Sequence, residues 1–315
     1  MRRRALLPAL AVAATVAAGG SARAGEAPSG GGPVVNSLGL RMVLVPAGSL
    51  EMGSPRSEPS RQEDEAPHRV ALTKPFRISA TEVTRRQWLA LMPRGAGLRD
   101  DDAPIASVSW NEAEEFCARL SRKEGATYRL PTEAEWEYSC RAGGAEPPVT
   151  AGDLAAVAWY AENADGTAHP VGQKKANAWG LQDMLGNVAE WTLDVYGPYP
   201  RAEEAKDPAG PAEGSARVVR GGSWRSFPPA LRCAARMGTP QSYQLAHVGL
   251  RVVQEIEGTV DRPSGSARDL ARGAVGVRLD ADRPSPSNRG QLSDRSRPLV
   301  AAGPGAEALG SPPAR

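Results

Sequence analysis

The aromatic residues of this chain are confined to one stretch, and this limits most strongly where it can build a core. All sixteen lie between Phe76 and Tyr243 in a chain of 315 residues. Large apolar side chains must offset an ordering entropy of about 1–2 kcal/mol per residue. Residues 257–315, rich in Gly, Pro, Ser, Arg and Asp, are therefore predicted to form a disordered tail. One folded domain is expected over residues 37–256, after a short linker at residues 25–36.

The N-terminus has the three parts of a secretory signal peptide, predicted over residues 1–24. Three arginines precede a short apolar run, and a small-residue sequence ends at Ala24. The run is too short for a stable membrane-spanning helix, although an uncleaved anchor remains the alternative. Arg3–Leu7 loosely fits a twin-arginine signal, which leaves that export route open. The mature protein is expected to be periplasmic or secreted, with no membrane span.

Signal-peptide cleavage would change the net charge of the chain, and export would change the expected role of its cysteines. Cleavage removes four arginines and no acidic residue, so the formal net charge changes from +2 to −2. This balance gives no reason to expect a nucleic-acid partner. Disulfides persist outside the cytoplasm, and the three cysteines allow one disulfide and leave one thiol.

The first half of the domain carries clear local signals. Residues 42–54 predict two short strands around a Pro-Ala-Gly turn, residues 55–68 a polar loop, and residues 69–79 an extended segment. Three helices follow, each starting with a capping box, in which a hydroxyl residue and the third residue after it bond each other's backbone N–H. The capping pairs are Thr84 with Gln87, Ser109 with Glu112, and Thr132 with Glu135.

The second helix is expected to end at Gly125. Its apolar face comprises Trp110, Ala113, Phe116, Cys117 and Leu120. From Ala145 to Arg251 the helical periodicity is weak, and the predicted strands are short. Irregular backbone there needs partners for its carbonyls, and a bound cation or a disulfide would supply them.

Four ordered segments carry a family resemblance: YRLPTEAEWEYSCRAG (128–143), NAWGLQDMLGNVAEWTLDVYG (177–197), RVVRGGSWRSFPPALRCAAR (217–236) and HVGLRVV (247–253). With MVLVPAGSLEMGS and ISATEVTRRQW before them, they resemble the formylglycine-generating enzyme family, the sulfatase-modifying factors. The resemblance covers about residues 37–254. It implies a single α+β domain, low in regular secondary structure, related to the C-type lectin fold and often holding calcium.

The best-known members of that family oxidise a sulfatase cysteine to formylglycine, using dioxygen and copper(I) held by two cysteines. The first of these cysteines corresponds to Ser226 here, and the second has no counterpart because the segment is shorter. Serine does not replace a thiolate for copper(I), so a copper site is not expected. Ser223 and Ser226 remain weak catalytic candidates, and Ser223 could either bind a ligand or only stabilise its turn.

The resemblance also implies that Cys140 and Cys233 form a disulfide. It would close a loop of roughly ninety residues and stabilise the fold by up to about 4–5 kcal/mol in the chain-entropy model. The alternative role of Cys233 is a thiolate nucleophile beside Arg232. Cys117 lacks its family partner, because Val252 stands at that position. It is expected to be a buried free thiol.

For calcium, the family pattern carries over to Asp183, the carbonyls of Gly186 and Val188, and Glu190. Calcium prefers several such oxygens, but the two carboxylates could instead only cap turns or face solvent. A second family site would begin at residues 163–164, where a later carboxylate is missing.

An iron site is not expected, because no two of the three histidines have close helical spacing. These histidines are His68, His169 and His247. Ala189, where many members have tryptophan, would widen a neighbouring pocket.

Two functions of different classes remain open. The first is an exported, calcium-stabilised binding module for a peptide, glycan, protein or small molecule. The second is a divergent oxidase or tailoring enzyme acting on a peptide or secondary metabolite, and standard formylglycine formation ranks third. The residues favour the binding module slightly and leave open whether the protein is an enzyme.

Overall fold

The computed structural model describes residues 32–92, 99, 101–144, 151–199 and 204–256. All of them belong to one compact unit of the chain, which ends at Gly258. The predicted signal peptide, most of the predicted linker and the predicted tail lie outside the described residues. Within the described residues, no helix is both long and apolar enough to cross a membrane.

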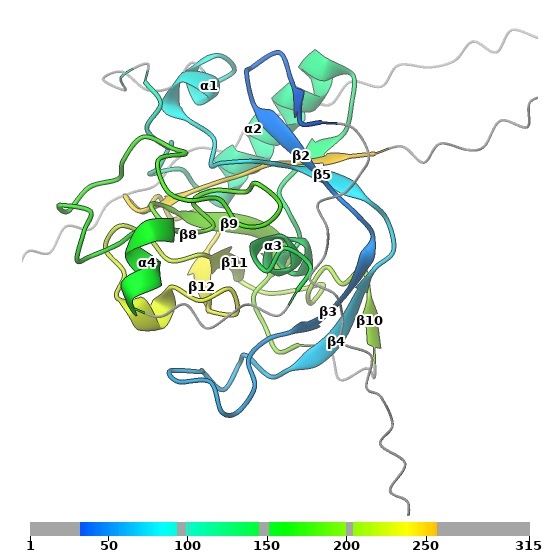
Figure 1. Cartoon of the computed structure of the whole chain (residues 1–315). Coiled ribbons are helices and arrows are strands. Elements are labelled where there is room, and N and C mark those ends of the chain that lie inside the picture. The colour runs from blue at the N-terminus through cyan, green and yellow to red at the C-terminus, as the bar shows by residue number, and fades with distance from the viewer. Residues whose placement is uncertain (1–31, 93–98, 100, 145–150, 200–203, 257–315) are drawn as a thin grey trace, which may run out of the picture. The chain divides into compact units, whose positions relative to one another are not determined.

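The described residues form a mixed α+β domain of short elements (Figure 1). The helices are α1 (Arg85–Leu89), α2 (Trp110–Glu124), α3 (Glu133–Cys140) and α4 (Ala151–Val157), with a 3₁₀ turn at Pro228–Ala230. The strands are β1 (Val34–Val35), β2 (Arg41–Val45), β3 (Gly48–Met52), β4 (His68–Leu72), β5 (Phe76–Ser79), β6 (Tyr128–Arg129), β7 (Ala158–Trp159), β8 (Leu185–Gly186), β9 (Ala189–Val195), β10 (Glu204–Lys206), β11 (Ala216–Arg220), β12 (Arg236–Pro240), β13 (Val248–Gly249) and β14 (Val253–Glu255).

The strands build several small sheets. Their orders are β1-β2-β5-β14-β6, β10-β4-β3 and β12-β11-β9-β13, and β7 pairs with β8. The two strands predicted around the Pro-Ala-Gly turn are present as β2 and β3. They do not form a hairpin, because β2 pairs with β5 while β3 pairs with β4. The chain thus crosses from one sheet to another at this turn.

The capping boxes place α1, α2 and α3 where the sequence predicts them. In each, both reciprocal bonds between the capping residue and the third helical residue are present. Gly125 ends α2 in the left-handed conformation, with φ 64°, which glycine adopts at low cost. Helix α4 was not predicted, because its seven residues lie in a region of weak periodicity.

The apolar face of α2 packs as expected, with one difference. Ala113, Phe116, Cys117 and Leu120 are buried in a core cluster that also contains Trp191. Trp110 is half-buried, because its indole N–H donates to the Thr192 carbonyl, 2.8 Å away, at the edge of that cluster. A buried indole N–H requires such a partner.

Helix α3 is wholly buried near the centre of the domain (Figure 1). Its three glutamates are therefore among the buried charges, and each one pairs with arginine, as burial of a charge requires. The pairs are Glu133 with Arg236, Glu135 with Arg129, and Glu137 with Arg141 and Arg220. These arginines come from β6, β11, β12 and the end of α3, so the ion pairs join several elements to one helix.

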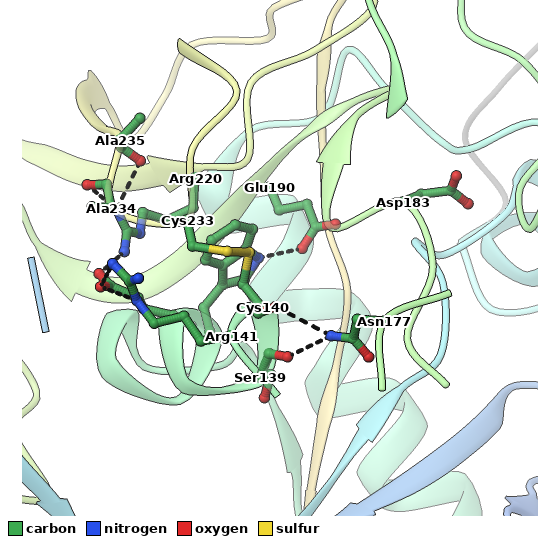
Figure 2. Close-up of a disulfide and its surroundings, with 12 residues drawn as sticks. Ser139, Cys140, Arg141, Asn177, Asp183, Glu190, Arg220, Cys233, Ala234 and Ala235 are labelled. Carbon is green, nitrogen blue, oxygen red and sulfur yellow. Dashed lines mark hydrogen bonds and ion pairs between the residues drawn. A yellow bond between two sulfur atoms is a disulfide. The ribbon is translucent and has the colours of Figure 1, made fainter. Parts of the chain in front are cut away.

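A disulfide between Cys140 and Cys233 ties the end of α3 to the segment before β12, as Figure 2 shows. The Cα atoms are 5.8 Å apart and the residues are 93 apart in sequence. The pairing implied by the family resemblance is thus present. Cys233 is consequently not a free thiolate nucleophile in this structure.

Because the disulfide closes a long loop, reduction should lower the free energy of unfolding by up to about 4–5 kcal/mol. Urea unfolding of the purified protein with and without a phosphine reductant would measure this. The Cys140→Ala/Cys233→Ala double variant is the control, since its stability should not respond to the reductant. An equal response in both proteins would assign the effect to something other than this disulfide.

Candidate functional site

The position of the family's first active-site cysteine lies in a tight turn, the serine turn, formed by residues 221–227 after β11. The Ser223 N–H donates to Ser226 Oγ at 3.0 Å, and the Ser226 N–H donates to the Ser223 carbonyl at 2.9 Å. The turn begins with positive φ at Gly221 and Gly222, and a Cβ at Gly222 would lie 2.8 Å from Leu231. Both serines therefore hold the turn together, which is one of the two roles predicted for Ser223.

Each cysteine of the chain is either in a disulfide or buried. Cys140 and Cys233 form the disulfide, and Cys117 is free and buried, as predicted. Burial raises the pKa of the Cys117 thiol well above its usual value, so the reactive thiolate is disfavoured. Two thiolates cannot meet at Ser226, because the sequence contains only these three cysteines.

A second region, the Arg251 cluster, comprises Glu82, Asp183, Glu190 and Arg251, all of them buried. Arg251 lies between β13 and β14, and its guanidinium forms a two-pronged ion pair with Glu190 of β9. Its Nε donates to Oε2 at 2.6 Å and its Nη2 donates to Oε1 at 2.7 Å. The Trp136 indole N–H also donates to Oε2 at 2.7 Å, which links the cluster to α3 (Figure 2).

The other two carboxylates of the Arg251 cluster are less well satisfied. Asp183 Oδ2 accepts the Gly172 N–H at 2.6 Å, and Glu82 Oε1 accepts the Val188 N–H at 3.3 Å. Asp183 Oδ1 and Glu82 Oε2 are buried and have no hydrogen-bond partner among the described residues. Burial and the negative charges of Asp183 and Glu190 raise the pKa of Glu82 well above its usual value. The raised pKa favours the protonated, neutral form of Glu82 beside the ion pair of Glu190 with Arg251.

The residues predicted for calcium run from Asp183, just before β8, to Glu190 in β9. Asp183 has φ 54° and Gly186 has φ 77°, and a Cβ at Gly186 would lie 2.2 Å from the Trp159 carbonyl oxygen. Glu190 is neither a turn cap nor solvent-facing, because Arg251 and Trp136 engage both of its oxygens. At the predicted second site, Asn163 Oδ1 accepts the Tyr160 N–H at 2.8 Å and therefore serves its own turn.

The three histidines occupy separate environments. His68 Nδ1 lies 3.0 Å from the Ala66 carbonyl, His169 stacks on Trp159 with ring centroids 3.8 Å apart, and burial lowers the pKa of His247. Across the described ranges, no group of three or more His, Cys, Asp or Glu could hold a metal ion. Ala189 is buried in the α2 core cluster, so its small size serves packing there.

Glu82 and Arg251 were not singled out from the sequence. Both occupy apolar surroundings in the chain, Glu82 next to Val83 and Arg251 between Leu250 and Val252. A charged residue within a buried apolar run signals a buried partner. The identity of the partner depends on the fold, since Glu82 and Arg251 are far apart in sequence.

Fold and site together define a class: a mixed α+β domain with irregular connections, stabilised inside by arginine–carboxylate pairs. Residues 36–256 match the family model described as "Sulfatase-modifying factor enzyme 1-like domain". The chain therefore belongs to this family, as its motifs indicated.

Formylglycine-generating enzymes are among the curated relatives. The enzyme of Bos taurus is 35% identical over 179 residues, which cover 50% of this chain and 46% of the relative. The Streptomyces coelicolor enzyme is 29% identical over 310 residues, which cover 76% and 96%. The chain thus spans about half the length of the mammalian relatives that it matches.

Two solved structures share the fold. PvdO from Pseudomonas aeruginosa has a TM-score of 0.64 and 31% identity, covering 70% of this chain and 96% of that one. Treponema denticola variable protein 1 has a TM-score of 0.63 and 27% identity, covering 71% and 98%.

Removing Arg251 should be strongly destabilising, because it leaves three buried carboxylates without their cation. We expect Arg251→Met to lower the free energy of unfolding by about 3–5 kcal/mol, measured by urea unfolding. Arg69→Met is the matched control, since Arg69 forms an exposed ion pair with Glu204 at 3.0 Å. Arg69→Met should lower the free energy of unfolding by less than about 1 kcal/mol. Equal losses of unfolding free energy in the two variants would show that Arg251 contributes no more than an exposed ion pair.

Proposed function

We propose that this chain is an exported, ligand-binding member of its family that does not form formylglycine by copper-dependent oxidation. The proposal rests on which positions have a cysteine and on the disulfide bond of Cys233. The copper site of the best-known members needs two thiolates, whereas this chain has a serine at one position, no residue at the other, and Cys233 in a disulfide. The donor set does not fit copper(I), so no catalytic step through copper is derived.

Export is supported by the N-terminal sequence and by the disulfide. A cleavable signal would deliver the chain to a compartment where disulfides persist. The Cys140–Cys233 disulfide then acts as a permanent link between α3 and the segment before β12.

A binding role is supported by apolar side chains exposed at and after the serine turn. Phe227, Met237 and Tyr243 are each exposed by 42% or more. Aromatic side chains provide large contact areas at binding interfaces. The ligand class proposed here is a peptide, a protein or a small molecule.

Calcium is proposed as a structural ion at the Arg251 cluster. The support is the buried Asp183 Oδ1, which has no hydrogen-bond partner among the described residues. Asp183, the carbonyls of Gly186 and Val188, and Glu190 would hold the ion, and the charge of calcium would favour the ionised form of the Asp183 carboxyl group. Glu190 would contribute through Oε1, because a carboxylate oxygen accepts at two positions and Arg251 occupies only one there.

Oxidative tailoring of a small molecule is the second candidate. Hercynine oxygenase of Mycolicibacterium smegmatis is 29% identical over 246 residues, which cover 62% of this chain and 56% of that enzyme. This relative shows that the family includes oxygenases. The described part of this chain offers no set of three metal-ligating side chains for such chemistry, which places this candidate second.

The proposal predicts that the protein does not convert a cysteine-containing sulfatase peptide to the aldehyde when supplied with copper(I) and dioxygen. Mass spectrometry of the peptide would detect the product. The Streptomyces coelicolor enzyme, assayed in parallel, is the positive control. Aldehyde formation at a comparable rate by this chain would overturn the proposal.

Calcium binding should raise the thermal midpoint, because a ligand that binds only the folded state stabilises it. After treatment with a chelator, calcium at 100 times its dissociation constant should add about 2.7 kcal/mol. Differential scanning calorimetry should then show a rise of about 2–4 °C per kcal/mol. The rise should be absent in Asp183→Ala and retained in Glu51→Ala, an exposed control on β3. No rise in the unmodified protein would remove calcium from the proposal.

A further inference from the structure

A cavity of about 500 Å³ lies where the three-stranded sheet β10-β4-β3 meets the start of α3 and the end of β9. Loop residues 197–199 and 208–211 complete its wall, and Arg236 of β12 also lines it. Neither the serine turn nor the Arg251 cluster contributes to its lining. The volume is within the range that holds small organic ligands.

The cavity has an apolar body with a few polar groups at its surface. Its apolar lining includes Met52, Ala134, Ala205, Pro208 and Pro211. Such a surface suits an aliphatic chain, and the few polar groups then decide which head group is accepted.

The polar atoms left without a partner in this cavity are hydrogen-bond acceptors. His68 Nδ1 must donate to the Ala66 carbonyl, 3.0 Å away, because a carbonyl only accepts. In the neutral ring Nε2 is then an acceptor, and it is buried without a partner. Asp194 is 3% exposed, and the one hydrogen bond to its carboxylate from a described residue comes from the Glu133 N–H to Oδ2 at 2.7 Å. Oδ1 remains available.

Among the residues that the structure describes, no arginine or lysine forms an ion pair with Asp194. Both oxygens of Glu133 accept from Arg236, each at 2.7 Å, so that arginine is already engaged. Glu204 pairs with Arg69 at 3.0 Å. Lys206 also lines the cavity, and its side chain is solvent-exposed. Burial and the neighbouring Glu133 raise the pKa of Asp194 to about 7.

We infer that this cavity binds a small molecule with an alkylammonium group, whose ammonium pairs with Asp194 and whose chain lies against the apolar wall. An ammonium has three N–H donors. It can therefore donate one to Asp194 Oδ1 and one to His68 Nε2, which have no donor of their own. The inference adds a site and a ligand class to the proposed binding role without resting on it.

Isothermal titration calorimetry on the mature protein at pH 8 would test this, using hexylamine, hexan-1-ol and hexanoate as probes. Hexylamine is protonated at this pH, as lysine is, whereas Asp194 is mostly ionised. We expect hexylamine to bind at least about tenfold more tightly than hexan-1-ol, and hexanoate not to bind. Equal affinities for the amine and the alcohol, or no binding of the amine, would overturn the inference.

Asp194→Asn should weaken hexylamine binding at least about tenfold, because the amide keeps the bond to Glu133 N–H but loses the charge. Glu204→Gln is the matched control, since it removes a carboxylate of the same cavity that already has a partner, and affinity should stay within about twofold. Loss in both variants would indicate a general charge effect and overturn the assignment to Asp194.

A pH titration of the unmodified protein keeps the test valid if Asp194→Asn does not fold. Because burial and Glu133 raise the pKa of Asp194 to about 7, its ionised fraction falls about tenfold from pH 8 to pH 6, and hexylamine affinity should fall similarly. The other charged groups near it are Glu133 and Glu135 of α3, Arg236 of β12, His68 of β4 and the β10 pair Glu204 and Lys206. An unchanged affinity across this range would contradict the inference.

Discussion

The fold of the domain depends on neutralising the charged glutamates of α3, a helix that is wholly buried inside it. Glu133, Glu135 and Glu137 cannot be buried as charges without partners, since each would cost several kcal/mol. Arginines from β6, β11 and β12 meet this requirement, and those of β11 and β12 bring two distant parts of the chain to one helix. Burial alone would lower the pKa of Arg220, but Glu137 raises it above its usual value, so the guanidinium stays charged. Ion pairs thus organise a domain with little regular secondary structure.

The second buried charge system extends this organisation towards the functional loops. Trp136 of α3 donates to Glu190, Glu190 pairs with Arg251, and Asp183 precedes the turn that leads into β9. The disulfide fixes the opposite end of α3 to the segment that follows the serine turn. At the position of the first copper-binding cysteine of other members, this chain has Ser226, whose hydroxyl accepts the Ser223 N–H and holds the serine turn.

Several features were predictable because they depend on neighbours in sequence. The capping pairs Ser109–Glu112 and Thr132–Glu135 act over one helical turn, so the starts of α2 and α3 followed from the residues alone. The Cys140–Cys233 disulfide was expected only through the family resemblance, since three cysteines by themselves allow three pairings. Helix α4 was missed because seven residues carry too little periodicity. The placement of Glu82 and Arg251 in one buried cluster was missed, because the neighbouring residues in sequence do not show which charged residue will be the partner of a buried charge.

The sequence by itself determined the extent of the apolar core, the starts of three helices and the lack of a second thiol at the serine turn. Each of these depends on composition or on residues within a few positions of one another. Only the tertiary structure decided that Arg220 and Arg236 neutralise glutamates of α3, that Glu190 pairs with Arg251, and that Asp194 lines a cavity. These ion pairs join residues 61 to 103 positions apart, and they form only when several sheets and α3 are assembled together.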